Sequence, residues 1–158
     1  MGFFLSLYIS EKICYNVNMR IVSFFRKRIA DFFYRRKQKR LGLSFPLYCK
    51  AHGVKAKERQ GAIAQSRAKD TLQLVHAPIE RYPFNVYIYS IPLNRVLGYL
   101  DERLSKKLVN LFGDGFCVDG VIENITGENY AVRGCNLQIF ETRTMLSHMR
   151  DFSHLYGE

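Results

Sequence analysis

The order of structural signals between residues 71 and 112 constrains the fold of this chain more than any other feature of its sequence. An apolar stretch, T-L-Q-L-V-H, leads into a bend with two prolines, and a stretch rich in tyrosine and β-branched residues, N-V-Y-I-Y-S-I, follows. Residues of these types favour strands. A short third stretch ends in G-Y-L, and leucines at helical spacing come next. This order predicts three strands, the first two joined by the bend, and then an amphipathic helix.

The flanking segments add three more expected strands and a second helix. A length of 158 residues with 47% hydrophobic residues is sufficient for one packed domain with an extension. The expected strands lie at residues 44–52, 71–76, 85–91, 95–100, 116–124 and 130–140. Six short strands with two helices predict a mainly β, α+β domain built as a small, closed or nearly closed OB-like β-barrel.

Local signals mark the ends and irregularities of these elements. Pro46 indicates an edge strand or a bulge, and Gly134 is a candidate bulge in the last strand. A short helix is expected at residues 57–67. The second helix is expected to begin after Asp101, which is a residue type that caps helices, and to end at Gly113 in the left-handed conformation.

Positive charge is concentrated in residues 1–40. This segment holds ten Lys or Arg against Glu11 and Asp31, so it carries +8 of the formal net charge of +10. Composition and charge therefore predict three parts: a basic N-terminal extension over residues 1–42, a barrel domain over 43–141 and a C-terminal tail over 142–158. The nearly neutral barrel domain is not expected to bind a polyanion through net charge alone.

Residues 20–40 have the pattern of a basic amphipathic helix. The apolar residues that recur on one side at helical spacing are Ile21, Val22, Phe25, Ile29, Phe32 and Phe33. The basic residues of this N-terminal arm, which fall mostly elsewhere, are Arg26, Lys27, Arg28, Arg35, Arg36 and Lys37. Three roles fit the pattern: packing against the chain's own domain, binding to an anionic membrane surface, or binding to nucleic-acid phosphates.

Targeting signals and common catalytic motifs are not found in the sequence. The apolar run at residues 1–9 is shorter than the ~20 residues that span a bilayer. Positive charge follows this run, whereas it precedes the apolar stretch of a secretory signal, so a cytoplasmic location is expected. No P-loop, H-E-x-x-H, G-x-S-x-G or G-x-G-x-x-G motif occurs, the cysteines form no C-x-x-C pair and the histidines are scattered. We therefore expect a non-enzymatic chain with reduced cysteines and without a metal or cofactor.

Two sequence patterns in the central unit are more specific than its composition. The bend A-P-I-E-R-Y-P-F-N-V-Y-I-Y keeps Pro78, Tyr82 and Asn85 of the pattern E-P-x-N-P-Y-D-x-N-A-I-x-V. The segment L-G-Y-L-D-E-R-L-S-K-K-L keeps Gly98, Tyr99 and Leu108 of the pattern V-G-Y-[LIV]-P-x-x-x-A-x-x-[LI]. A first strand, a glycine and an Arg-Gln pair that opens a helix precede both. In this order, over residues 44–141, the chain resembles the HIRAN domain family.

The resemblance implies a small β-barrel that binds DNA, single-stranded or at strand ends, with a helicase or nuclease as a partner. The residues expected to bind nucleic acid are Tyr82, Arg81, Asn85, Lys55, Lys57, Arg59 and Tyr99. The chain also differs from the family. Pro83 stands where an Asp takes the terminal sugar hydroxyl, Lys55 and Ala56 stand where an Arg and an aromatic residue hold the strand, and Asp101 and Glu102 replace basic residues.

The residues themselves also favour a binding role. Single-stranded nucleic acid is bound by aromatic side chains that stack on bases and by basic groups along the phosphates. Tyr82, Tyr87, Tyr89 and Tyr99 lie on the bend and the strands after it. Since Tyr87 and Tyr89 share a face of one strand, one of them is a candidate core residue, and Tyr82 can instead close the mouth of the barrel. Two functions fit: a nucleic-acid-binding module aided by the arm, or a protein-interaction or membrane-peripheral adaptor.

Overall fold

The computed structural model describes residues 26–127 and 130–141, and the chain divides into two compact units, Met1–Gly42 and Leu43–Glu158. In the first unit, residues 26–40 form a helix. The expected helical pattern of residues 20–25 and the tail at 142–158 lie outside the described residues. Among the described helices, none combines the length and the apolar character needed to cross a membrane.

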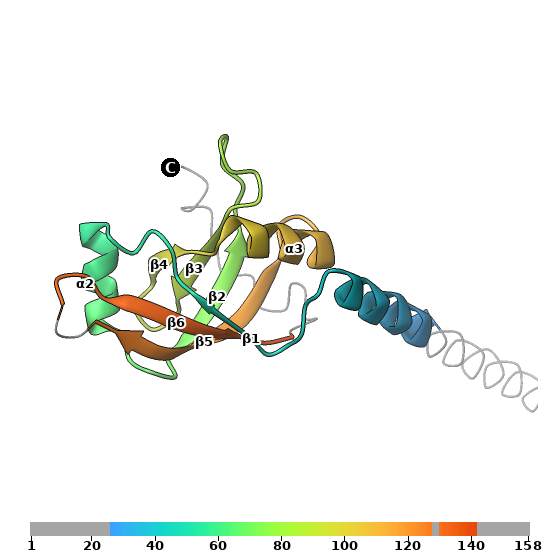
Figure 1. The fold of residues 1–158 in the computed structure, drawn as a ribbon, viewed down its shortest axis with the longest axis horizontal. Coiled ribbons are helices and arrows are strands. Elements are labelled where there is room, and N and C mark those ends of the chain that lie inside the picture. Colours follow the sequence, from blue (N-terminus) through green and yellow to red (C-terminus); the bar gives the residue numbers. More distant parts are fainter. Residues whose placement is uncertain (1–25, 128–129, 142–158) are drawn as a thin grey trace, which may run out of the picture. The chain divides into compact units, whose positions relative to one another are not determined.

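The second unit is a six-stranded antiparallel sheet that curls into a half-barrel, as the sequence predicted (Figure 1). The strands are β1 (Leu47–Lys50), β2 (Thr71–His76), β3 (Val86–Ser90), β4 (Arg95–Tyr99), β5 (Cys117–Thr126) and β6 (Gly134–Ile139). Their order in the sheet is β1-β6-β5-β2-β3-β4, and every neighbouring pair is antiparallel. The helices are α2 (Lys57–Gln65) and α3 (Glu102–Phe112), which lie on separate sides of the sheet (Figure 1).

One backbone bridge joins the two edges of the sheet. The amide of His52 donates to the carbonyl of Tyr99 at 2.8 Å, and the amide of Tyr99 donates back at 3.1 Å. The preceding residue, Ala51, still pairs with the β6 side through the carbonyl of Cys135. Residues 51–52 therefore change partners from β6 to β4. This is why β1 is shorter than the 44–52 strand expected from sequence, although its place at a sheet edge agrees with the signal from Pro46.

Alternation of apolar residues along the strands builds the core. Every second residue of β5 and β6 is buried over Val118–Ile122 and Cys135–Ile139, as expected for strands with one covered face. By contrast, β2 and β3 are buried on both faces, apart from Thr71. On their second face Val75, Ala77 and Tyr87 form a separate small cluster. The sequence predicted that one residue of the pair Tyr87 and Tyr89 belongs to the core, and the structure shows that both are buried.

The ends of the helices are set by identifiable hydrogen bonds. The Asp101 carboxylate accepts from the amides of Arg103 at 3.0 Å and Leu104 at 3.3 Å, which confirms it as the N-cap of α3. Gly113 ends α3 with φ 95° and ψ 176°, so φ is positive as expected but ψ is extended rather than left-handed helical. In α2, the side-chain amide of Gln60 donates to the carbonyls of Val54 and Arg133 and accepts from the Arg133 amide.

The bulge lies in β5 and not at Gly134, where it was expected. The register of β5 against β6 shifts between Ile122 and Asn124, whereas Gly134 pairs regularly with Thr126. A neighbouring turn accounts for this, because the carbonyl of Ile122 accepts from the Lys69 amide at 2.7 Å and its amide donates to Asp70. Gly134 has a different role: a Cβ there would lie 2.6 Å from Thr126 Oγ1.

Gly98 is the residue whose replacement tests the bridge between the sheet edges. A Cβ at this position would lie 2.5 Å from the carbonyl oxygen of His52, which is backbone and cannot rotate away. We expect Gly98→Ala to lower the free energy of unfolding by about 1–3 kcal/mol, measured by urea denaturation. Gly61→Ala in α2 is the matched control, because nothing lies within 4 Å of its Cβ, and it should stabilise by about 0.5–1 kcal/mol. Equal stability of the two variants would contradict the role given to the bridge.

Candidate functional site

A cleft of about 320 Å³ opens beside the bend that joins β2 to β3. Four segments line it: the bend with the start of β3, the end of β4 with the first turn of α3, His52 just beyond β1, and α2. Four of the seven residues predicted to bind nucleic acid lie in its wall, namely Arg59, Tyr82, Asn85 and Tyr99. The structure thus brings together residues that lie up to 53 positions apart in the sequence, from His52 to Ser105.

Hydrogen bonds hold the bend in a shape that leaves Tyr82 exposed. Ile79 and Tyr82 exchange backbone hydrogen bonds of 3.3 and 2.9 Å, which closes a tight turn. The side-chain amide of Asn85 donates to the carbonyl of Ala77 at 3.0 Å, and this ties the two ends of the bend together. The ring of Tyr82 is 57% exposed and lines the cleft. Asn85 therefore shapes the bend with one N–H of its side-chain amide, and it also lines the cleft.

His76 anchors the bend to the turn before β5. Its Nδ1 accepts from the amide of Gly115 and its Nε2 lies 2.9 Å from the carbonyl of Pro83, so the proton is on Nε2. The ring also stacks on Phe116, with centroids 5.8 Å apart and planes inclined by 14°. Pro83 has no side-chain acceptor, and its carbonyl already accepts a hydrogen bond from His76.

Arg59 and Tyr99 form the wall opposite the bend. The guanidinium of Arg59 lies over the Tyr99 ring, with its Cζ 5.6 Å from the ring centroid, and its Nη1 donates to the carbonyl of Gly53 at 3.0 Å. The Tyr99 ring also packs directly against Gly53, where any Cβ would collide with it. The close packing explains why residue 53 is a glycine. The stack of Arg59 on Tyr99 places a cation over an aromatic ring at the edge of the cleft.

The first turn of α3 makes the third wall and is acidic. Asp101 and Glu102 line the cleft there, together with Ser105, which is 1% exposed. Sequence reasoning included the two acidic residues as features that oppose phosphate, but it missed Ser105, Phe84 and His52. Phe84 follows the prolines of the bend and has Lys106 over its ring at 5.3 Å, a contact between segments distant in sequence that no local pattern indicates.

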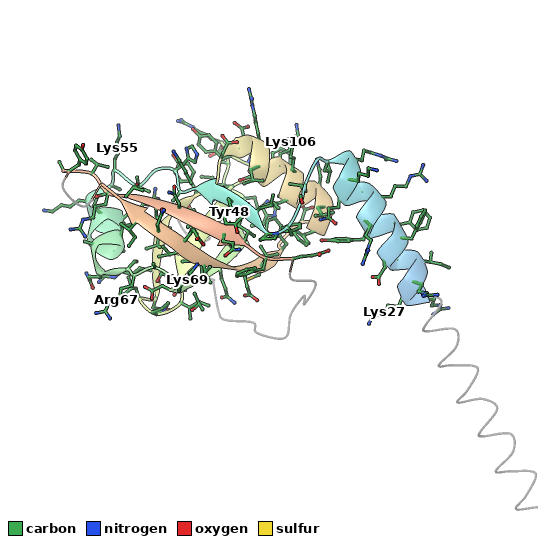
Figure 2. All side chains as sticks on the ribbon, turned by 60° about the horizontal axis from the view of Figure 1, so that its bottom comes forward. Lys27, Tyr48, Lys55, Arg67, Lys69 and Lys106 are labelled. Atoms are coloured by element: carbon green, nitrogen blue, oxygen red, sulfur yellow. The ribbon has the colours of Figure 1, made fainter. Side chains whose placement is uncertain are left out.

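The other predicted basic residues lie outside the cleft wall. Lys55, Lys57 and Arg81 are exposed and do not line it. Figure 2 shows Lys55 projecting from the loop that leads to α2. The basic residues of the arm that the sequence singled out belong to the first unit, where Arg26, Lys27, Arg28, Arg35, Arg36 and Lys37 are all exposed. The cleft itself therefore has one arginine and two carboxylates as its charged residues.

Within residues 26–127 and 130–141, no three His, Cys, Asp or Glu side chains gather as metal ligands would. The three cysteines of this part of the chain are free and lie on β1, β5 and β6. Burial raises the pKa of Cys49 to about 12 and that of Cys117 to about 11, and Asp119 adds to the second shift. Burial, and to a smaller extent Cys49, raises the pKa of Cys135 to about 12. These thiols are protonated at neutral pH and are poor nucleophiles.

The raised thiol pKa values predict slow alkylation of the folded protein. Only the thiolate reacts, so an unfolded thiol, whose ordinary pKa is 9.0, is reactive at pH 8–9. Each native thiol should stay unreactive there and should react only as pH approaches 11–12. Peptide mapping after iodoacetamide treatment resolves each cysteine, with protein in urea as the control. Labelling of Cys49, Cys117 and Cys135 at the same rate with and without urea would show that they are not buried.

Comparison of the chain with protein-family models, with curated proteins and with solved structures found no match. The likeness to the HIRAN family therefore stays a prediction that rests on the sequence patterns of the bend and of the β4–α3 segment.

Proposed function

We propose that this chain is a non-catalytic nucleic-acid-binding module that takes single-stranded DNA, or the unpaired end of a strand, into the cleft beside the bend. The observation that carries the proposal is the combination of an exposed tyrosine with an arginine–tyrosine stack across one cleft. Tyr82 is 57% exposed and Tyr99 is 38% exposed. Exposed rings in a cleft are the means by which proteins bind unpaired bases, because every base has a face that stacks.

The shape of the cleft favours an unpaired base over a duplex. A volume of about 320 Å³ accommodates a group of the size of one nucleotide, whereas a double helix would have to bind across an open surface. The walls are mostly aromatic and aliphatic, with Ile79, Phe84 and Leu100 between the polar groups. Arg59 is the group suited to a phosphate at the cleft edge, because its guanidinium is held by Gly53 and Tyr99 and remains at the wall.

The arm supplies the electrostatic part of the proposed affinity. The cleft has only Arg59 against Asp101 and Glu102, so its own charge does not attract a polyanion. The exposed basic residues of the N-terminal arm attract the polyanion instead, and their binding releases counterions from the phosphates. This division of roles predicts binding that depends strongly on salt through the arm and on aromatic stacking through the cleft.

Tyr82→Ala tests the cleft in the full chain. Loss of one stacked base should weaken binding of a fluorescent single-stranded oligonucleotide by about tenfold, within the ~1–3 kcal/mol of a base–aromatic stack. The matched control is Tyr48→Ala, because Tyr48 lies on β1, is 65% exposed and does not line the cleft (Figure 2). Fluorescence anisotropy measures both. If the two variants bind with the same affinity, the cleft is not the binding site.

A membrane-peripheral adaptor is a second candidate, favoured by one feature of the N-terminal helix. Three apolar side chains on one side of it are exposed: Ile29 at 55%, Phe32 at 61% and Phe33 at 60%. The two phenylalanine rings pack edge to face, with centroids 5.7 Å apart. Nucleic-acid phosphates need only the basic residues of this helix, whereas an anionic lipid surface uses basic and apolar residues together.

Two variants of the full chain separate these roles of the arm. Arg35→Ala with Arg36→Ala and Lys37→Ala should weaken DNA binding and reduce the slope of log affinity against log salt by about 2, at ~0.7 per lost phosphate contact on a single strand. Phe32→Ser with Phe33→Ser keeps every charge and should leave DNA binding unchanged. If the phenylalanine variant instead abolishes binding to phosphatidylserine vesicles, and the parent chain binds vesicles but no oligonucleotide, the adaptor function is correct and the DNA proposal is wrong.

A further inference from the structure

We propose that the α3 end of the cleft reads the hydrogen-bonding edge of the unpaired base and prefers a base with an exocyclic amino group to one with a carbonyl at that place. The inference rests on the proposed function and deepens it, because it assigns base selectivity to particular residues. It starts from a buried hydroxyl group, on a residue of the cleft wall, that has no hydrogen-bond partner in the described part of the chain.

Ser105 Oγ is that group. The residue is 1% exposed, it lines the cleft, and its hydroxyl has no partner among the described residues. A buried serine at a helix normally donates to the carbonyl four residues earlier, as Ser66 does to Ala62 at 3.0 Å. In α3 the Asp101 carbonyl accepts the Ser105 amide at 2.9 Å and not the hydroxyl. A buried hydroxyl without a partner is costly. Because Ser105 is a residue of the cleft wall, a ligand bound in the cleft is the candidate partner for this hydroxyl.

The carboxylates at the same end determine what kind of ligand atom is accepted. Asp101 uses its carboxylate to cap α3. Glu102 is exposed, lines the cleft and makes no ion pair with any residue between 26 and 141 that the structure describes. An ionised carboxylate only accepts hydrogen bonds. It therefore attracts an amino group and repels a carbonyl oxygen or a phosphate that approaches this wall.

Charge also orients the strand in the cleft. The stacked guanidinium of Arg59 stands at the α2 wall, and the acidic groups stand at the α3 wall. A nucleotide with its phosphate toward Arg59 has its base, stacked on Tyr82, directed toward Ser105 and Glu102. Cytosine then presents its N4 amino group to the carboxylate, and uracil presents its O4 carbonyl. The Ser105 hydroxyl can donate a hydrogen bond to either base or accept one from it, so it strengthens the binding of both. Discrimination between the two bases therefore falls to Glu102.

Oligo-deoxycytidine and oligo-deoxyuridine of about eight nucleotides form the test pair, because these bases have the same size and differ only at ring positions 3 and 4. Fluorescence anisotropy with the full chain at one fixed salt concentration should show about fivefold tighter binding of the cytosine strand. Glu102→Gln should bring the ratio close to one, since an amide both donates and accepts, and should improve binding of the uracil strand. A ratio of one or below in the parent chain, or an unchanged ratio in Glu102→Gln, would overturn the assignment.

Ser105→Ala is tested against a matched control in the same fold. Ser90 on β3 also has a buried hydroxyl without a partner in the described part of the chain, but it does not line the cleft. We expect Ser105→Ala to weaken binding of the cytosine strand severalfold and Ser90→Ala to leave it unchanged, with both variants as stable as the parent. Equal affinities of the two variants would remove Ser105 from the site. If the parent chain binds neither strand, the proposed function fails together with this inference, whereas binding without base preference refutes the inference alone.

Discussion

The site depends on the backbone bridge between His52 and Tyr99. This pair of hydrogen bonds joins the two edges of a sheet whose order would otherwise leave β1 and β4 far apart. It places the Tyr99 ring against Gly53, and Arg59 reaches both from α2. The glycine at position 98 allows the close approach, because any side chain there would meet the His52 carbonyl. The same contact thus curls the sheet and builds one wall of the cleft.

The opposite wall depends on a polar network rather than on apolar packing. His76 connects the bend to the β5 turn, and Asn85 connects the two ends of the bend. With its backbone groups satisfied in this way, the bend can stand out from the core and expose Tyr82. Asn85 matches the sequence pattern of a binding residue, and the structure shows that it also supports the bend. In the function proposed above, Tyr82, Arg59 and the first turn of α3 also contact the ligand.

Much of the fold was predictable from local signals. The bounds of β2 and α3 agree with expectation, β3 is one residue shorter at each end and β4 is one residue shorter at its end, because alternation, turn residues and the Asp101 cap all act over a few positions. The errors occurred where a distant partner takes a backbone group. β6 was expected to start at Tyr130, but the backbone of Arg133, just before the observed strand, is hydrogen-bonded to the side chain of Gln60. In β5, the backbone groups of Ile122 are hydrogen-bonded to Lys69 and Asp70 at the position of the bulge.

The sequence by itself determined the six strands, the two helices of the domain, the basic character of the arm and the presence of aromatic and basic residues around the bend, because these follow from periodicity, capping and composition along the chain. Only the tertiary structure decided which of these residues share a cleft. It separated Tyr82 and Tyr99, which are exposed, from Tyr89, which is buried, and it brought Ser105 and Glu102 opposite Arg59. The reason is physical: the cleft is formed by the curl of the sheet and its edge-to-edge bridge, and these depend on contacts between residues far apart in the sequence.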